Sequence, residues 1–128
     1  MNRSPDISVI IPCWNVADWL ASCLDDVLPS LPAAAEVLAV DDGSTDRTLT
    51  ILKARAARDS RIVVVESAHR GVSAARNLAL DRARGRFVFF VDPDDGVEPD
   101  YFTSLIVRLE QTRADTALCG YSEREDGA

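Results

Sequence analysis

Short apolar runs alternate with longer amphipathic segments along the chain. The apolar runs are rich in β-branched residues and are bounded by polar or turn-forming residues, which is typical of buried β-strands. They cover residues 7–11, 36–40, 61–66 and 87–91, and a fifth, shorter run covers residues 116–119. Between them, apolar residues recur every three or four positions, as in an α-helix with one buried face. These helical segments cover residues 16–28, 45–58, 72–84 and 99–113.

Polar residues, proline and glycine mark the expected ends of these helices. Asn15 is placed to cap the first helix, and Ser44 or Thr45 the second, because their short side chains accept hydrogen bonds from free backbone N–H groups. Pro29 is expected to close the first helix and Gly85 to stop the third. The residues of the third helix expected to face inward are Val72, Ala75, Leu78 and Ala79.

Apolar strands separated by helices favour an α/β fold, in which a mainly parallel sheet is covered by helices on both faces. In such sheets the crossovers are right-handed and ligands bind beyond the carboxyl ends of the strands. Polar clusters follow three of the predicted strands, at residues 12–15, 41–46 and 92–95. We therefore expect these clusters, which are distant in the chain, to converge on one rim of the sheet.

The composition fits one compact domain and argues against several kinds of partner. A chain of 128 residues that is 47% hydrophobic can bury one core, so we predict a single domain over residues 1–128. The net charge of −7 argues against binding to nucleic acid, which requires clustered Lys and Arg. No run approaches the ~18 apolar residues that span a bilayer, and we find no signal-peptide pattern.

The number and spacing of the cysteines indicate the cellular compartment of the protein. Cys13, Cys23 and Cys119 have no metal-binding spacing and are odd in number, so we expect reduced thiols in a cytoplasmic protein. Docking at the periphery of a membrane through a segment outside this chain stays open, and so does the formation of a homo-oligomer.

The acidic cluster after the fourth predicted strand is the strongest single feature. Asp92, Asp94 and Asp95 repel one another and favour a hard cation between them, either Mg²⁺ or Mn²⁺, together with phosphate oxygens. An acidic turn that caps the following helix is the alternative interpretation. An EF-hand loop beginning at Asp92 would need glycine and glutamate where the chain has Val97 and Thr103, so that reading fails.

The two other polar segments each allow a functional and a structural reading. Asp42 can accept a hydrogen bond from a base or a ribose, with Gly43 turning the backbone, but the same residues also suit an Asx-type turn. Arg76 can pair with a phosphate or with the acidic cluster, but an ordinary structural ion pair explains it equally well. The single histidine, His69, is expected to be a surface residue rather than a general base.

Four motifs occur in order along the chain, at residues 8–15, 40–46, 71–77 and 90–95. Their order and spacing resemble those of the family-2 glycosyltransferases with a GT-A fold, and the resemblance extends from residue 7 to about residue 102. It implies a nucleotide-sugar donor, most simply a UDP-sugar, and a divalent metal. It also implies single displacement with inversion onto a carbohydrate or lipid-linked acceptor, as in cell-surface polysaccharide biosynthesis.

The resemblance implies roles for individual residues. The nucleotide-sugar site is implied at Pro12, Cys13, Asn15, Asp41, Asp42, Gly71, Arg76, Asn77, Asp92 and Asp94. The metal ligands are implied at Asp94 and Asp95.

The family pattern continues beyond what this sequence contains. Family members carry an acceptor-binding region that supplies an Asp or Glu base. We expect this chain to stop before that region and leave the base unassigned, because Glu123, Glu125 and Asp126 match no base motif. A non-catalytic nucleotide-binding module that needs a partner or a further segment is the main alternative. Nucleotidyl transfer is disfavoured, since residues 12–15 form no glycine-rich basic loop.

Overall fold

A computed structural model describes residues 5–117 and residue 119. In this part of the chain four strands form one sheet, and four helices connect and cover them. The strands are β1 (Ile7–Cys13), β2 (Ala35–Asp41), β3 (Ile62–Glu66) and β4 (Phe87–Phe90). The helices are α1 (Ala17–Ser30), α2 (Thr48–Arg58), α3 (Val72–Arg82) and α4 (Tyr101–Thr112). All paired strands are parallel, in the order β3-β2-β1-β4, which confirms the predicted parallel sheet.

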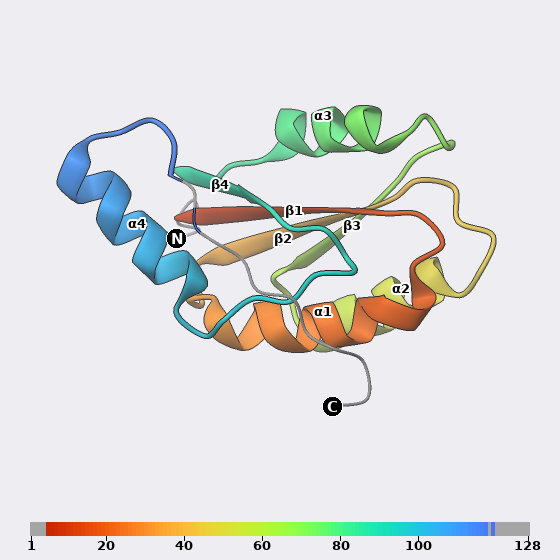
Figure 1. Cartoon of the computed structure of the whole chain (residues 1–128). Helices are drawn as coiled ribbons and strands as arrows, with labels where there is room; N and C mark the ends of the chain where they lie inside the picture. Colours follow the sequence, from red (N-terminus) through yellow and green to blue (C-terminus); the bar gives the residue numbers. More distant parts are fainter. Residues whose placement is uncertain (1–4, 118, 120–128) are drawn as a thin grey trace.

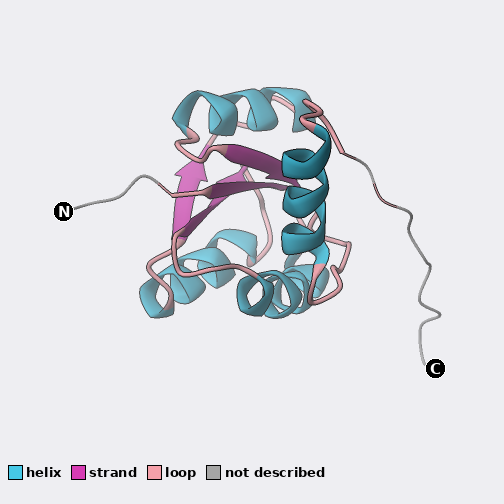
Figure 2. Cartoon of the chain, turned by 90° about the vertical axis from the view of Figure 1, so that its left-hand side faces the viewer, coloured by secondary structure: helices cyan, strands magenta, loops and turns pink. Residues whose placement is uncertain are grey.

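The helices cover the two faces of this sheet, as predicted. Helix α3 lies on one face, and α1 and α2 lie on the other (Figure 1). The view from the side shows these layers, with the strands between them (Figure 2). The strands run in one direction, so the loops that follow β1, β2 and β3 gather at the right-hand end of the sheet in Figure 1.

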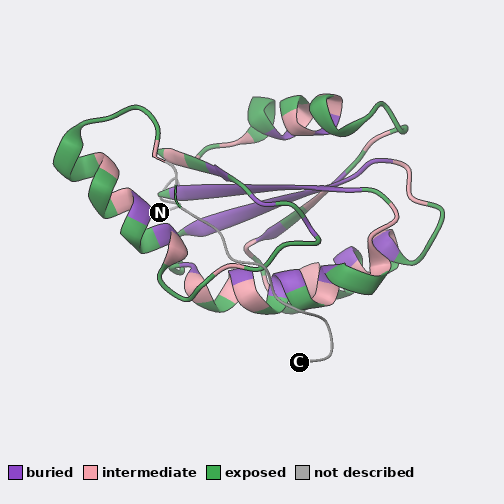
Figure 3. Ribbon diagram, in the orientation of Figure 1, coloured by how far each residue is buried: buried purple, intermediate pink, exposed green. Residues whose placement is uncertain are grey.

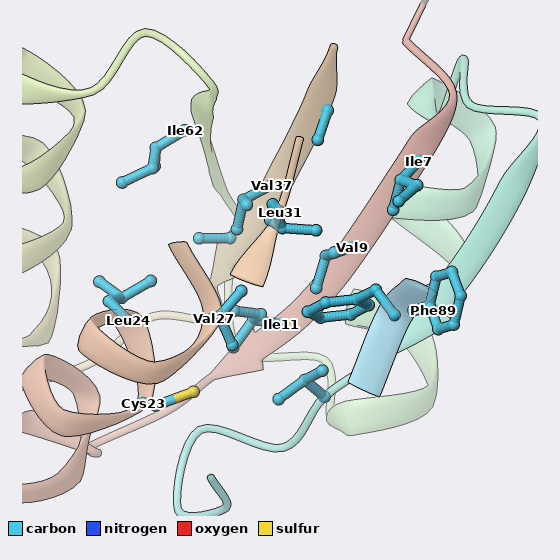
Figure 4. Packing of buried hydrophobic residues seen from close by; sticks show 14 of the residues in the cluster. Ile7, Val9, Ile11, Cys23, Leu24, Val27, Leu31, Val37, Ile62 and Phe89 are labelled. Atoms are coloured by element: carbon cyan, nitrogen blue, oxygen red, sulfur yellow. The ribbon is translucent and has the colours of Figure 1, made fainter. Parts of the chain in front are cut away.

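The core consists of two buried clusters, one on each face of the sheet. The larger one joins β1 and β2 to α1 and α4 through residues such as Val9, Leu24 and Phe102 (Figure 4). The smaller one lies under α3, where Ala75 and Ala79 pack on Leu38. These two helix positions confirm the predicted inward face in part.

The two central strands and the two edge strands differ in burial. Every residue of β1 and β2 is buried, as their continuous apolar runs predict (Figure 3). The edge strands alternate instead, and they expose Val63 on β3 and Val88 and Phe90 on β4. An edge strand has a neighbour on one side only, so its outward residues stay partly in solvent.

The cap predicted for α1 is wrong. Asn15 has a left-handed backbone, with φ 51°, and α1 begins two residues later, after Val16. The free N–H groups at this end are satisfied by the loop after β2 and the first residue of α2: Val16 N donates to Thr48 Oγ1 at 3.0 Å, and Ala17 N donates to Asp46 Oδ2 at 3.1 Å.

The caps predicted for α2 are wrong as well. The helix begins at Thr48, beyond both Ser44 and Thr45, and Asp46 Oδ1 accepts from Thr48 N at 2.9 Å. The Ser44 hydroxyl instead accepts from Asn15 N at 3.0 Å. The local sequence shows which residues can cap a helix. The N–H groups that several of them bond, however, belong to the other of the two loops, about thirty positions away in the chain.

Three smaller expectations also need correction. Helix α3 ends at Arg82 and is followed by Ala83 in an extended conformation, so Gly85 is not its stop residue. Val72 does not face the core, because 51% of it is exposed. Pro29 lies inside the last turn of α1 rather than after it.

The fifth strand and the tail lie partly outside the described residues. Thr116, Ala117 and Cys119 form no strand, and Leu118 falls outside the described part. Glu123, Glu125 and Asp126 lie outside it too.

A buried hydrogen-bond network closes the edge of the sheet where the strands begin. Ser8 Oγ donates to Glu36 Oε2 at 2.6 Å, and Arg84 N donates to the same oxygen at 2.7 Å. Gly85 N donates to Ser8 Oγ at 2.7 Å. A Cβ at Gly85 would lie 2.5 Å from the Ser8 backbone nitrogen, so a residue without a side chain is needed for this close approach.

Candidate nucleotide-binding site

A cavity of about 360 Å³ opens at the carboxyl ends of the strands. Its walls come from the loop after β1, the end of β2, the loop before α3 and the turn after β4, together with the first turns of α1 and α3. This is the rim at which parallel α/β sheets bind ligands. The lining residues are Pro12, Cys13, Trp14, Val16, Trp19, Asp42, His69, Gly71, Val72, Ala75, Asp92, Pro93 and Asp94.

Asp42 is a buried carboxylate held by backbone donors. Its Oδ1 accepts from Arg70 N at 2.9 Å, and its Oδ2 accepts from Gly71 N at 2.9 Å. Burial raises the pKa of Asp42, but these two bonds and further neighbours outweigh it, so the pKa lies below its ordinary value. Asp42 therefore stays ionised at neutral pH and ties the loop before α3 to the end of β2.

Two aromatic rings form one wall of the cavity. Trp14 and His69 stack with ring centroids 4.7 Å apart and 24° between the planes. His69 Nδ1 lies 3.2 Å from the Asp42 carbonyl oxygen and 3.6 Å from Asp42 Oδ2. Trp14 is 48% exposed, so the stack leaves a large flat apolar surface open to a ligand.

The turn after β4 places two carboxylates, those of Asp92 and Asp94, in the wall of the same cavity. Asp95 N donates to Asp92 O at 3.0 Å, which tightens the turn. Arg76 Nη2 reaches across from α3 to Asp92 Oδ1 at 3.0 Å. The capping alternative does not hold, because Asp100 is the residue that directly precedes α4.

The acidic turn has the charge that favours a cation. Burial, followed by the charges of Asp94 and Asp92, raises the pKa of Asp95 above its ordinary value. Among the described residues, no three His, Cys, Asp or Glu side chains gather in a metal-binding cluster. Mg²⁺ and Mn²⁺ are commonly held by one or two carboxylates plus phosphate oxygens, so the turn suits a cation that arrives with a diphosphate.

The structure brings together about half of the predicted site residues in the cavity wall. Those that line it are Pro12, Cys13, Asp42, Gly71, Asp92 and Asp94. Those outside the wall are Asn15, Asp41, Arg76, Asn77 and Asp95.

The residues outside the wall differ in their surroundings. Asp41 is buried, and its Oδ1 has no hydrogen-bond partner among the described residues. Arg76 reaches the cavity only through Asp92, and Asn77 is exposed on α3. Asn15 faces the loop after β2 rather than the cavity.

Sequence reasoning missed most of the apolar wall. Trp19 and Val72 each line the cavity with 51% of their surface exposed. Trp14 lies in a recognised motif, but no role follows from its position alone. The available signal was a large aromatic residue in the loop directly after a buried strand, where a core position is impossible.

The two buried cysteines are poor nucleophiles. Burial, with the nearby Cys23 and Asp41 as smaller contributors, raises the pKa of the Cys13 thiol far above its usual range. Burial and nearby carboxylates raise the pKa of Cys23 to about 12. All three cysteines are free, in agreement with the expected reduced thiols. Cys13 therefore shapes the cavity rather than reacting in it.

Known proteins resemble this chain in sequence and in fold. The family model for glycosyl transferase family 2 matches residues 8–127. The chain belongs to glycosyl transferase family 2. It is 39% identical over 115 residues to Glycosyltransferase GlyA of Streptococcus pneumoniae, covering 90% of this chain and 16% of that protein. It is 38% identical over 117 residues to the uncharacterized glycosyltransferase EpsJ of Bacillus subtilis, covering 91% of this chain and 34% of that protein.

Solved structures agree on the fold. The chain superimposes on S. aureus TarS in complex with UDP-GlcNAc with a TM-score of 0.78 and 27% identity, covering 94% of this chain and 37% of that one. A mannosyltransferase from Pyrobaculum calidifontis, in complex with GDP-Man and Mn²⁺, gives a TM-score of 0.75 and 30% identity, covering 84% and 33%. These matches confirm the predicted GT-A fold, and the chain spans well under half of each protein named.

Proposed function

We propose that this chain forms the donor-binding part of a glycosyltransferase, which holds a nucleoside diphosphate sugar together with Mg²⁺ or Mn²⁺. The observation that supports it best is that one cavity is lined by Asp42, by the stacked rings of Trp14 and His69, and by Asp92 and Asp94. A flat base needs an aromatic surface and a fixed hydrogen-bond partner, whereas a diphosphate needs positive charge. The cavity can meet the first need directly and the second through a cation.

The proposed contacts follow from this layout. The base lies against Trp14 and near Asp42, and the backbone around Pro12, Cys13 and Gly71 lines its pocket. The ribose and diphosphate lie toward Asp92 and Asp94, with Asp94 as a metal ligand and Asp95 as a second one. Arg76 neutralises Asp92 in the ligand-free state and is close enough to the turn to meet a phosphate. When bound, the metal would stabilise negative charge on the leaving diphosphate.

We propose that the donor is a UDP-sugar. The TarS structures contain UDP or UDP-GlcNAc, and the P. calidifontis mannosyltransferase contains GDP-Man with Mn²⁺. A pyrimidine ring is smaller than a purine and needs less stacking area on the half-exposed Trp14 ring. Titrating UDP and GDP against the same protein separates the two.

In the full protein we propose single displacement with inversion. The acceptor hydroxyl of a carbohydrate or lipid-linked acceptor attacks the anomeric carbon from the face opposite the nucleotide. Its proton passes to a carboxylate base, and the nucleoside diphosphate leaves. We assign that base to polypeptide outside the described residues, because Asp42 and Asp92 at the cavity already have partners.

The engagement of Asp42 and Asp92 also favours a second candidate. The chain would then be a nucleotide-binding module that becomes catalytic only with further polypeptide. Incubation of the chain with a UDP-sugar and Mn²⁺ distinguishes the two, because slow hydrolysis of the donor by the chain alone would argue against a purely binding role.

Calorimetric titration tests the main proposal. We expect UDP to bind in the presence of Mn²⁺ and to bind much more weakly with a chelator. Asp94→Ala should weaken binding at least about tenfold, in line with the loss of a metal ligand. Asp81→Ala is the matched control, because Asp81 is exposed on α3 and does not line the cavity. Metal-independent binding, or equal effects of the two variants, would contradict the proposal.

A further inference from the structure

We propose that Asn15 is a positioning residue, which acts on the site through Trp14 rather than by touching the ligand. Its side chain locks the loop between β1 and α1 onto the loop between β2 and α2, and so fixes the Trp14 ring against His69. The part of this inference that concerns affinity rests on the proposed function, whereas the part that concerns the ring stack does not.

The side-chain oxygen of Asn15 accepts hydrogen bonds from the neighbouring loop. Its Oδ1 accepts from Thr45 N at 2.8 Å and from Asp46 N at 3.3 Å. Its own backbone N donates to Ser44 Oγ at 3.0 Å. These three bonds join residues about thirty positions apart. The amide therefore stabilises the second loop and is turned away from the cavity.

The segment between β2 and the start of α2 in turn accepts hydrogen bonds from the start of α1. Asp46 Oδ2 and Thr48 Oγ1 accept from the first two N–H groups at the start of α1, those of Ala17 and Val16. Each loop thus caps the other, and the two form one interlocked unit. Asn15 stands at its centre with φ 51°, a conformation that asparagine adopts more readily than most residues.

The aromatic wall depends on this unit from both sides. Trp14 directly precedes Asn15, so the backbone of Asn15 sets where the indole begins. His69 is anchored to the other loop through the Asp42 carbonyl oxygen, 3.2 Å from its Nδ1. A Cβ on Gly43 would lie 3.0 Å from His69 Cβ, so this loop also packs directly beneath the histidine.

The stack leaves Trp14 half in solvent, where an aromatic side chain is not held by a core. A ring that is already ordered before the ligand arrives avoids the entropic cost of ordering it on binding. Loss of the interlock should therefore weaken nucleotide binding although every side chain that contacts the ligand keeps its chemical identity.

The composition of the chain allows a direct test of the ring stack. There are two tryptophans, so in a Trp19→Phe background all indole emission comes from Trp14. The His69 ring covers one face of the Trp14 indole, so the stack should protect Trp14 from a soluble quencher such as acrylamide. We expect His69→Ala to remove that protection.

Two substitutions at position 15 separate the backbone conformation from the hydrogen bonds. Asn15→Gly keeps the left-handed backbone accessible and removes the Oδ1 acceptor, whereas Asn15→Asp keeps both. We expect Asn15→Gly to lose the protection of Trp14 from acrylamide and Asn15→Asp to retain it. Ser44→Ala, which removes only the acceptor for Asn15 N, should weaken it to an intermediate degree and guards against misfolding of the glycine variant.

The affinity for UDP with Mn²⁺ gives the second readout. Asn15→Gly should bind about tenfold more weakly than the parent, and Asn15→Asp within about twofold of it. Unchanged protection of Trp14 from acrylamide in both Asn15→Gly and Ser44→Ala would overturn the inference, whatever the nucleotide affinity does. Failure of the parent protein to bind UDP, with the expected pattern of Trp14 protection, would overturn the proposed function and leave the role of Asn15 in positioning Trp14 intact.

Discussion

Buried carboxylates at the two ends of the sheet differ in how completely they are hydrogen-bonded. Where the strands begin, Glu36 accepts from the Ser8 hydroxyl and from Arg84 N, and Gly85 closes tightly over the group. Where the strands end, Asp42 is equally well bonded, but Asp41 Oδ1 and Arg76 Nε are buried without partners among the described residues. Unpaired buried polar atoms cost stability, so they concentrate where a protein has another use for them.

Backbone conformation shows the same contrast. Of the five positive φ angles among the described residues, those of Asn15, Gly43, His69 and Gly71 lie in loops at the end that carries the cavity, and the fifth belongs to Arg113, which follows α4. The other end is built from tight packing and satisfied hydrogen bonds. One end of the sheet is therefore closed by packing and hydrogen bonds, and the other end carries the cavity in which we propose that the nucleotide binds.

The largest expected effect comes from filling the tight end. In Gly85→Ala the new Cβ would lie 2.5 Å from both the backbone N and the Oγ of Ser8, and neither can move without breaking β1 or the Glu36 network. We expect a loss of about 3 kcal/mol in the free energy of unfolding, measured by denaturant titration.

Gly96→Ala is the matched control for Gly85→Ala. A Cβ there would meet the Asp26 carboxylate, the far end of a flexible side chain that can turn away. Its effect should stay within about 0.5 kcal/mol. Equal losses in the two variants would show that the end where the strands begin is not specially packed.

The same chemical change at the two ends should give different results. Asp42→Asn places an NH₂ group against the N–H of Arg70 or Gly71, because both carboxylate oxygens are acceptors there. We expect a loss of about 2 kcal/mol in stability, together with loss of nucleotide binding.

Glu36→Gln is the counterpart of that change. Glu36 receives both of its short bonds on one oxygen, which the amide oxygen can replace. The stability loss should be about 1 kcal/mol, and UDP affinity should not change. A larger loss at Glu36 than at Asp42, or a loss of UDP affinity in Glu36→Gln, would reverse the comparison.

Acid should loosen the cavity end. Burial raises the pKa of Asp42 and of Asp46, but hydrogen bonds outweigh it, from Arg70 and Gly71 at Asp42 and from Thr48 at Asp46. A carboxyl whose pKa is lowered by folding stabilises the protein above its unfolded pKa, and that stability is lost as the pH falls through the folded value. The free energy of unfolding should therefore decline below about pH 4.

Denaturant titrations at a series of pH values check this decline. In Asp42→Asn the decline should be shallower, because the variant has one less carboxyl to protonate. Asp95 works in the opposite direction, since its pKa is raised, and Asp95→Asn should steepen the decline. An Asp42→Asn profile parallel to that of the parent would show that the Asp42 bonds do not contribute to this dependence.

The smallest effect concerns the thiols. Cys13 and Cys23 are buried with raised pKa values, whereas Cys119 is exposed. Iodoacetamide at about pH 8 should alkylate Cys119 in the native protein at least about tenfold faster than the other two. Peptide mass spectrometry measures the rates, and urea should make them equal. Rapid alkylation of Cys13 in the native protein would show that the part of the cavity wall around Cys13 becomes accessible to solvent.

The pattern of apolar residues was sufficient to predict the four strands of the sheet, their parallel direction and the rim at which the cavity lies, although the fifth strand that it also predicted does not form at Thr116, Ala117 or Cys119. Each strand can be recognised from its own run of apolar residues. Because ligands bind at the carboxyl ends of parallel strands, the positions of these ends also predict where the site lies. Asp42, Asp92 and Asp94 could be found because an acidic residue directly after a buried strand has little choice of location. The positions of these three residues follow from the sequence without any knowledge of how the side chains pack.

Only the tertiary structure showed which side chains the loops exchange. Asn15 reads as a cap for its own helix, yet its amide serves residues about thirty positions away, because the parallel register pairs Cys13 with Asp41 and brings the two following loops side by side. The Trp14–His69 stack arises in the same way, from loops after β1 and β3. Such contacts depend on the relative placement of strands, and a helix or strand pattern carries information only about neighbours in the chain.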